Sequence, residues 1–597
     1  MTSYTAPIVD MRFVLNHVVG LDQIASLPGC DAASPDLVDA VLEEAGKLAG
    51  EVLAPINRAG DKEGAVLENG TVRTASGFKE AYRLFVEGGW NGLPFEEAFG
   101  GQGLPWVVAT AVNEMWQAAN MAFGLCPMLT QGAVEALSQY GSEEQKTLYL
   151  PKLVSGEWTG TMNLTEPQAG SDLSAIRTKA VRDGGAYRIT GQKIFITYGD
   201  HDVAENIIHL VLARLPDAPP GIKGISLFIV PKFMVKPDGS LGQRNDLRCA
   251  GLEHKLGING SPTAVMAFGD NDGATGYLVG EENRGIEYMF AMMNNARLNV
   301  GLQGVAIAER AYQQAREYAK TRVQSRALNR PKDGPVAIIA HPDVRRMLLL
   351  MKSQTEATRA LAYTAAAALD VAKRHTDPAV ADAALKRVDL LIPVVKAWST
   401  DIGVEVASVG VQIHGGMGFI EETGAAQHYR DARIAPIYEG TNGIQANDLV
   451  FRKLGRDEGA AARGYIAEIK ALDGDLAARP GDDPAAIRRN LAAGADALEK
   501  ATDWLVAQVK ADPVAAAAGA ASYLRLFGTV AGGFLLARAA VAAQDALARG
   551  DGDPSFLEAK IVTARFYAEQ VLPQAEGLAA VVVEGHRSVM ALTDDQF

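Results

Sequence analysis

The sequence predicts a mainly α-helical protein with a central β domain, extended by a further helical domain. Three observations support this fold class. The chain has 597 residues, too many for one hydrophobic core. Its apolar residues follow a helical period, then form short β-branched runs, and then return to a helical period over long stretches. An alanine-rich stretch of helical composition closes the chain. We expect five parts: an N-terminal extension (1–34), an N-terminal helical domain (35–158), a middle β barrel (159–282), a four-helix bundle (283–455) and an additional helical domain (456–597).

The first helical domain shows its period most clearly near its start. Leu37, Val38, Val41 and Leu42 recur at helical spacing. A segment dense in glycine and proline, 88–105, then interrupts the helices, because such residues fix a non-helical path.

The middle region changes to a strand pattern. An Asp-Gly-Gly turn at 183–185 precedes the run 186–190, which predicts a hairpin. The β-branched apolar runs 207–212 and 225–230 are bounded by turn residues. Together these runs predict a small antiparallel barrel or sandwich.

Long helices return over 300–318, 344–369 and 383–410. Each is longer than the usual globular helix, and long antiparallel helices with apolar stripes favour a four-helix bundle. The final alanine-rich region contains a linker of Gly, Asp and Pro at 481–484. Its most membrane-like run, 526–537, is shorter than the roughly 20 residues of a membrane span, so we expect a buried core helix there.

Composition narrows the function classes. Hydrophobic residues make up 48% of the chain and charged residues 21%, which is typical of globular proteins. The net charge of −14 disfavours nucleic acid and anionic membrane surfaces as partners. Cys30, Cys126 and Cys249 have neither metal-ligand spacing nor a disulfide pattern, so we expect no metal site. Since residues 1–10 do not resemble a secretory signal, we expect a cytoplasmic location.

Five motifs carry the chemistry. They are NLTEPQAGSD (163–172), QKIFITYG (192–199), QIHGGMGF (412–419), RDARI (430–434) and IYEGTN (437–442). In this order and spacing they closely resemble the signature segments of acyl-CoA dehydrogenases, over roughly residues 40–450. The length and the C-terminal extension resemble the long subgroup of that family. A strand-linked G-x-G-x-x-G is absent, so the sequence does not support a Rossmann site for NAD.

The resemblance implies a bound FAD and assigns residues to it. Met162 and Leu164 would lie along the flavin, Thr165 would bond its pyrimidine end, Phe195 would pack on it in place of the family's usual tryptophan, and Thr197 would face its N5 atom. Arg322 would bind the FAD pyrophosphate, Gln412, Gly415 and Gly416 would serve the FAD of a neighbouring subunit, and Thr441 would also contact the cofactor. This sharing implies a homo-oligomer, and we expect a dimer because the C-terminal domain would cover the surface that shorter relatives use to form tetramers.

The same resemblance assigns the substrate side of the site. Ser171 would sit between the flavin and the pantetheine of CoA, and Arg297 matches a family position near the substrate. Asn294 stands where many relatives carry an acidic residue beside the CoA adenine. Glu439 would be the catalytic base.

Reaction chemistry agrees with a carboxylate at position 439. The α-proton of a thioester is weakly acidic, so its removal needs a base held against Cα, and burial makes a carboxylate more basic. Backbone N–H groups can stabilise the developing enolate. The β-hydride must go to a cofactor, because no side chain accepts it. Gly440 lets the backbone come close to a ligand.

The implied activity is the FAD-dependent oxidation of an acyl-CoA to the trans-2-enoyl-CoA, with electron transfer flavoprotein as acceptor. Segments 260–263, 277–281 and 292–294 resemble family members that convert 3-methylmercaptopropionyl-CoA to methylthioacryloyl-CoA in dimethylsulfoniopropionate catabolism. That thioester, or a short straight-chain acyl-CoA, is the expected substrate. Three alternatives stay open: an acyl-CoA oxidase that uses O2, a medium- or long-chain dehydrogenase of β-oxidation, and a non-catalytic flavoprotein scaffold.

Overall fold

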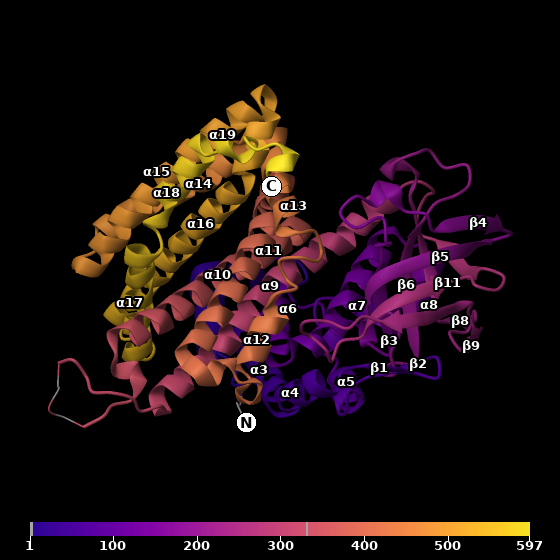
Figure 1. The fold of residues 1–597 in the computed structure, drawn as a ribbon, viewed down its shortest axis with the longest axis horizontal. Helices are drawn as coiled ribbons and strands as arrows, with labels where there is room; N and C mark the ends of the chain where they lie inside the picture. Colours follow the sequence, from indigo (N-terminus) through magenta and orange to yellow (C-terminus); the bar gives the residue numbers. More distant parts are fainter. Residues whose placement is uncertain (1–3, 330–331, 333) are drawn as a thin grey trace.

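The computed structural model describes residues 4–329, 332 and 334–597. Its parts follow the predicted order (Figure 1). The β domain lies at one side of the molecule, the long helices cross the middle, and the last helices cover the bundle on the opposite side (Figure 1). The predicted fold class is therefore confirmed.

The N-terminal part is helical. It contains α1 (Ile8–Phe13), α2 (Leu21–Ala25), α3 (Pro35–Lys47), α4 (Ala54–Glu63), α5 (Phe78–Glu87), α6 (Trp106–Ala119), α7 (Met121–Tyr140) and α8 (Glu143–Ser155). Ser34 caps α3 by accepting the Leu37 N–H at 3.3 Å, and Ser142 opens α8 with a capping box. Every residue of α6 is buried, because the bundle covers this helix. The glycine-rich segment 88–105 forms only isolated single turns, as its composition predicts.

Eight strands form the middle sheet. They are β3 (Trp158–Asn163), β4 (Lys179–Asp183), β5 (Ala186–Thr197), β6 (Asn206–Ala213), β7 (Ser226–Pro231), β10 (Leu247–Leu252), β11 (Thr263–Phe268) and β12 (Ala274–Leu278). Their order is β10-β11-β5-β12-β7-β6-β3, with β4 pairing β5 in the predicted hairpin. Two small ribbons stand apart: β1 (Val66–Glu68) with β2 (Thr71–Arg73), and β8 (Phe233–Val235) with β9 (Leu241–Arg244).

One pairing differs from the predicted antiparallel arrangement. Strand β3 pairs with β6 in parallel. Both strands are buried along their whole length, as parallel strands are, and α7 packs against β3. The run 207–212 was therefore correctly predicted as a strand, but its continuous apolar pattern gave no direction for its partner.

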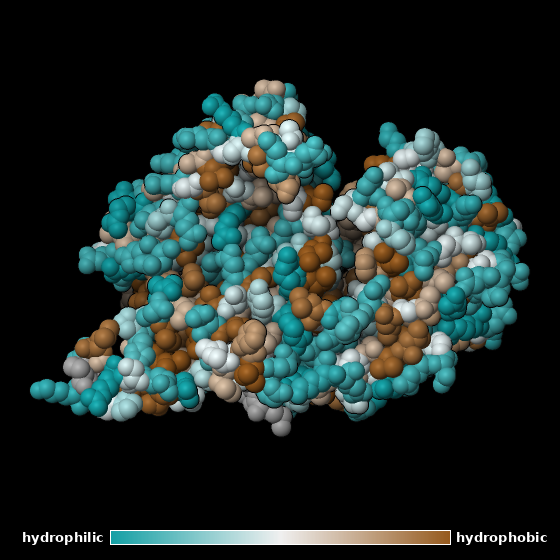
Figure 2. All heavy atoms as spheres, in the orientation of Figure 1, coloured by the Kyte–Doolittle hydropathy of each residue, from teal (hydrophilic) through white to brown (hydrophobic). Residues whose placement is uncertain are grey.

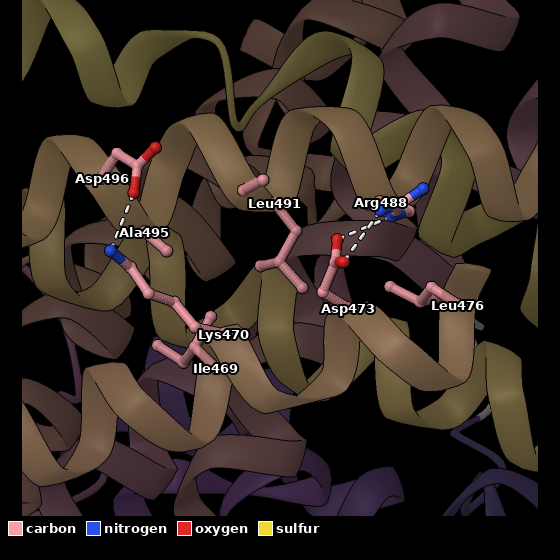
Figure 3. Close-up of a pocket in the computed structure, with 9 residues that line it drawn as sticks. Ile469, Lys470, Asp473, Leu476, Arg488, Leu491, Ala495 and Asp496 are labelled. Carbon is pink, nitrogen blue, oxygen red and sulfur yellow. Dashed lines mark hydrogen bonds and ion pairs between the residues drawn. The ribbon is translucent and has the colours of Figure 1, made fainter.

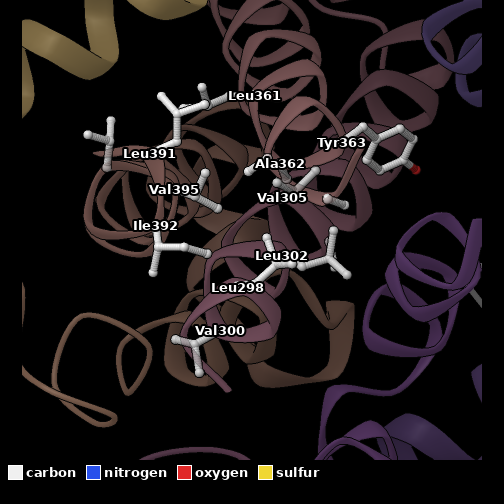
Figure 4. Packing of buried hydrophobic residues seen from close by; sticks show 14 of the residues in the cluster. Leu298, Val300, Leu302, Val305, Leu361, Ala362, Tyr363, Leu391, Ile392 and Val395 are labelled. Carbon is white, nitrogen blue, oxygen red and sulfur yellow. The ribbon is translucent and has the colours of Figure 1, made fainter. Parts of the chain in front are cut away.

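Three long helices and a short one make the bundle. They are α9 (Gly285–Thr321), α10 (Pro342–Arg374), α11 (Pro378–His414) and α12 (Ala425–Ala432). Leucine and valine side chains from the three long helices meet between them (Figure 4). Helices α9 and α11 approach closely at Gly304, where an added Cβ would lie 2.2 Å from the Ser399 carbonyl oxygen. The bundle is thus confirmed.

The additional domain packs directly on the bundle. It contains α14 (Ala460–Ala477), α15 (Asp482–Ala511), α16 (Pro513–Arg549), α17 (Pro554–Gln570), α18 (Gln574–Glu584) and α19 (His586–Val589). The predicted linker at 481–484 is shorter than expected, since α15 already begins at Asp482. Among the described residues one helix, α16, is long and apolar enough to cross a membrane. Of its most apolar window 83% is buried, so α16 is the core helix that the run 526–537 predicted.

A buried ion network ties the parts together. The Arg359 guanidinium on α10 contacts Asp10 at 2.6 Å, Glu114 at 2.6 Å and Glu309 at 2.8 Å. From α17, the Lys560 ammonium reaches the other oxygen of Asp10 at 2.6 Å. The N-terminal segment therefore packs into the core instead of extending from it, and it links the bundle to the last domain.

Candidate active site

Glu439 lies in a tight turn between the bundle and α13 (Asn442–Asn447). Its backbone φ is +55°, and that of Gly440 is +82°. A non-glycine residue in this region costs of order 1–3 kcal/mol and is found mainly at functional sites. The Gln445 amide donates to the carbonyl oxygens of Gly440 (3.3 Å) and Glu439 (3.5 Å), and the Thr441 hydroxyl caps α13. These bonds hold a strained turn that presents one carboxylate.

The surroundings of this carboxylate make it a stronger base. Glu439 is half-buried. Loss of hydration raises its pKa to about 7, although the positive charges of Arg297 and Lys396 lower it. The neighbouring Tyr438 hydroxyl contacts the Gln303 side-chain oxygen. A carboxyl group that titrates near neutral pH can accept a proton from a weak carbon acid.

Arg297, on α9, is the predicted substrate-side residue that the structure brings to Glu439. Its guanidinium is buried, and burial lowers its pKa. Its Nη1 atom lies 3.7 Å from Asp448, and its Nη2 atom would lie 3.7 Å from a Cβ at Gly440. The cation therefore sits beside the turn and is shared between two carboxylates.

Helix α11 holds the turn from behind, which the sequence analysis did not predict. The Asn442 amide donates to Asp401 at 2.7 Å, to Thr400 at 3.0 Å and to the Ala397 carbonyl oxygen at 3.0 Å. Its oxygen accepts from the Lys396 ammonium at 2.9 Å. A lone lysine inside the apolar run 390–398 was the signal in the sequence that could have found this contact.

A second group of predicted residues gathers where β3 ends and β5 passes. The Ile194 N–H donates to the Thr165 carbonyl oxygen at 2.9 Å, which places Thr165 beside Phe195. Met162 and Leu164 are buried just before Thr165. Within the described residues the hydroxyls of Thr165 and Thr197 make no hydrogen bond, so both are available to a ligand.

A buried ion pair fixes this group. Glu166 and Lys193 are 2.8 Å apart and almost fully buried. Burial alone would raise the pKa of Glu166, but Lys193 and the hydrogen bonds from Thr178 and Arg177 lower it to about 2. Because Lys193 also donates to the Leu164 carbonyl oxygen at 3.0 Å, the pair fastens the loop after β3 to strand β5.

Phe195 has an unusual conformation for a strand residue. Its φ is +58° and its side chain is 58% exposed. The register between β11 and β5 shifts next to it, between Ala264 and Met266. Bulges of this kind redirect a side chain out of the sheet, and here the Phe195 ring is exposed at the surface of the β domain.

The third group lies at the far end of the bundle. Arg322 follows the last residue of α9, about 37 Å along the helix from Arg297 at roughly 1.5 Å per residue. Tyr318 stacks on His414 with ring centroids 4.4 Å apart, so Arg322 lies at the same end as Gly415. Gln412, Gly415 and Gly416 are exposed there. This end is too distant to share a ligand with Glu439 of the same chain.

The remaining predicted residues are placed as follows. Ser171 is exposed on the loop after β3, and Thr441 is half-buried beside Glu439. The side chain of Asn294 lies outside the described part of the structure. Among the described residues, no cluster of His, Cys, Asp and Glu is arranged to hold a metal ion.

A cavity in the additional domain lies away from the catalytic turn. One of about 260 Å³ lies between α14 and α15, flanked by the ion pairs Lys470–Asp496 and Asp473–Arg488 (Figure 3). Its other lining residues are leucine, isoleucine and alanine, and its charged residues are paired with one another. The surface is instead hollowed between the β domain and the C-terminal helices, next to α13 (Figure 2).

Four family profiles match successive parts of the chain. They describe the acyl-CoA dehydrogenase N-terminal domain (residues 38–157), middle domain (161–271) and C-terminal domain (283–454), and an acetyl-CoA dehydrogenase C-terminal-like domain (465–593). The chain is also 52% identical to the 3-methylmercaptopropionyl-CoA dehydrogenase of Ruegeria pomeroyi, over 96% of both chains.

The chain belongs to the acyl-CoA dehydrogenase family. It is an FAD-dependent oxidoreductase that dehydrogenates acyl-CoA thioesters. A butyryl-CoA dehydrogenase of Syntrophomonas wolfei is 36% identical over 100% of this chain and 99% of its own length. Among solved structures, Caenorhabditis elegans ACDH-11 in complex with C11-CoA covers 96% of this chain and 92% of its own, with a TM-score of 0.76. At 21% identity that likeness concerns the fold, including the additional domain.

Proposed function

We propose that this dehydrogenase oxidises 3-methylmercaptopropionyl-CoA to methylthioacryloyl-CoA, with Glu439 as the catalytic base. The observation that carries the substrate is the 52% identity, over nearly the whole chain, to an enzyme named for it. Because butyryl-CoA dehydrogenases are 36% identical over almost the full length, a short straight-chain acyl-CoA is the second candidate.

The role of Glu439 rests on the turn. The strained backbone aims the carboxylate, and its raised pKa of about 7 suits removal of an α-proton. Arg297 balances the negative charge before the proton arrives. Tyr438, held by Gln303, closes one side of the turn. Glu439 therefore takes the proton from Cα, and the pair of electrons left behind forms the Cα–Cβ double bond as the hydride leaves Cβ.

The residues near β3 and β5 fit FAD. The hydroxyls of Thr165 and Thr197, which have no hydrogen-bond partner among the described residues, lie on either side of Phe195 in the folded chain, and the Glu166–Lys193 pair holds this region in place. When bound, FAD supplies the acceptor for the β-hydride. The protein positions the flavin, excludes water and holds the base.

Assembly and partners follow from the third group of residues. Since Arg322 and Gly415 lie too far from Glu439 to share its ligand, they would serve the FAD of a second subunit. The resemblance assigned Arg322 to the FAD pyrophosphate without saying which subunit holds that FAD. We therefore propose a homodimer in the cytoplasm that passes its electrons to an electron transfer flavoprotein. Sedimentation of the flavin-loaded protein checks the dimer, and a monomer with full FAD content contradicts it.

A substrate panel tests the proposed reaction. Steady-state rates with a dye acceptor would be compared for 3-methylmercaptopropionyl-CoA, butyryl-CoA and lauroyl-CoA. The thioether should be turned over at least as efficiently as butyryl-CoA. The thioether sulfur is close in size to a methylene group. The ratio of kcat/KM for 3-methylmercaptopropionyl-CoA to that for butyryl-CoA should therefore not exceed about tenfold to a hundredfold. A strong preference for lauroyl-CoA would reject the assignment.

The oxidase alternative is tested in the same assay. Peroxide formation in air, without dye, would be measured beside dye reduction. We expect peroxide at a small fraction of the dye rate. Equal rates would identify oxygen as the acceptor.

A further inference from the structure

Helix α11 carries an ammonium group inside the protein. Lys396 is fully buried, and every residue from 390 to 400 is buried with it. An ammonium group has three donors, yet in the described part of the chain Lys396 reaches a single acceptor, the Asn442 side-chain oxygen at 2.9 Å. Within the described residues it forms no ion pair. Burying a cation with so few partners is costly, so packing alone does not explain a lysine here.

The acceptor connects Lys396 to the catalytic turn. Asn442 is the third residue after Glu439 and the first residue of α13. Its amide group is fixed by Asp401, Thr400 and the Ala397 carbonyl oxygen. The orientation of the Asn442 side chain is thus fully determined, with its oxygen facing Lys396.

Charged groups face Glu439 from two neighbouring helices. Arg297 approaches from α9 but is shared with Asp448. Lys396 approaches from α11, and Asp401 lies behind Asn442 on the same helix. Tyr438, on the turn itself, is neutral and bonded to Gln303. Lys396 is therefore a second cation, beside Arg297, that acts on the Glu439 carboxylate.

The additional domain covers this stretch of α11. An added Cβ at Gly528 or Gly532 of α16 would lie within 2.6 Å of the Trp398 ring, so helix and ring are in close contact. Helix α16 also packs against α13, and its Arg525 pairs with Glu405 of α11 at 2.7 Å. These contacts lie on the face of α11 that carries Trp398 and Glu405, about 200° around the helix from Lys396 at 3.6 residues per turn, so α16 supports α11 and α13 from the side away from the lysine.

We propose that Lys396 is a positioning residue for the catalytic base: it anchors the turn through Asn442 and stabilises the Glu439 carboxylate. This rests on the proposed role of Glu439.

The titration of the two groups agrees with this role. Burial lowers the pKa of Lys396 to about 7, and the charges of Glu439 and Asp401 oppose that change. Burial raises the pKa of Glu439 to about 7, and Arg297 and Lys396 oppose it. Removing the ammonium group therefore raises the pKa of Glu439, and the carboxylate needed for catalysis forms only at higher pH.

The test is the pH profile of flavin reduction, measured by stopped flow on the FAD-loaded enzyme with butyryl-CoA. In Lys396→Met the midpoint should rise by about one pH unit, the scale on which a nearby opposite charge shifts a carboxyl pKa. The rate at pH 7 should fall several-fold and recover above the new midpoint. Lys396→Gln removes the charge but keeps a donor for Asn442, so it should show the same shift with less loss of maximal rate.

A matched control comes from the same helix. Lys386 is exposed and pairs with Asp382, so Lys386→Met should leave the profile unchanged. If Lys396→Met and Lys396→Gln lower the rate equally at all pH values, the lysine is only structural and the proposal is wrong. The Glu439→Gln variant distinguishes failure of the catalytic role of Glu439 from failure of the positioning role of Lys396. If that variant keeps its activity, the proposed function fails; if it is inactive and the Lys396 variants keep the wild-type midpoint, only the role of Lys396 fails.

Discussion

Replacing Gly440 with alanine tests whether the shape of the turn sets the rate. Gly440 has a φ of +82°, and an added Cβ would lie 2.6 Å from the Gln445 amide nitrogen. The left-handed backbone costs an alanine about 1–2 kcal/mol. The contact also forces Gln445 away from the two carbonyl oxygens that it holds, at about 0.5–1.5 kcal/mol for each lost hydrogen bond. These terms add up to about 2–5 kcal/mol, so we expect the turn to shift.

A shift of about 1 Å in a catalytic group costs roughly a hundredfold in rate. Stopped-flow reduction of the flavin by butyryl-CoA measures this directly, and FAD content and thermal unfolding check the fold. Gly443→Ala is the matched control, since Gly443 is exposed and the nearest atom to its added Cβ is 3.9 Å away. It should react at the wild-type rate. If the flavin of Gly440→Ala is reduced at a rate within twofold of the control, the shape of the turn does not set the rate.

Two further predictions concern the buried ion pairs. Lys193→Met leaves the Glu166 carboxylate buried without its cation, which typically costs about 3–5 kcal/mol; the enzyme should lose FAD on gel filtration, and retention at the wild-type level would contradict the role of this pair. Lys560→Met removes the contact of α17 with Asp10 and Glu356, so the unfolding temperature should fall while the rate of flavin reduction in the folded enzyme stays the same. An unchanged unfolding temperature would show that this link contributes no stability.

The sequence predicted the order of the parts because the periods of its apolar residues are long and distinct. The run 383–410 lies inside α11, and the turn at 183–185 closes the hairpin β4–β5. The parallel pairing of β3 with β6 was missed, because a strand buried on both faces shows no alternation that would indicate its neighbour.

The site was predicted in part for a similar reason. Glu439 and Thr165 lie in short motifs that can be read locally. Lys396 and Lys193 act through contacts with residues 46 and 27 positions away, and only the fold brings those residues together. The sequence also could not show that Arg322 lies at the opposite end of the bundle from Glu439, since that depends on the length and direction of α9.

The most direct test of the account is the rate of flavin reduction in Glu439→Gln. Glutamine keeps the shape of the side chain and removes the base, so FAD content and substrate binding should be unchanged. Reduction should fall by about 10² to 10⁴. Glu458→Gln is the control, because Glu458 is also a glutamate with a positive φ (+53°), paired with Lys510 on the surface of the additional domain; it should react like the wild type. Bleaching of the oxidised flavin band in Glu439→Gln at the wild-type rate would contradict the central claim and mean that another group removes the α-proton.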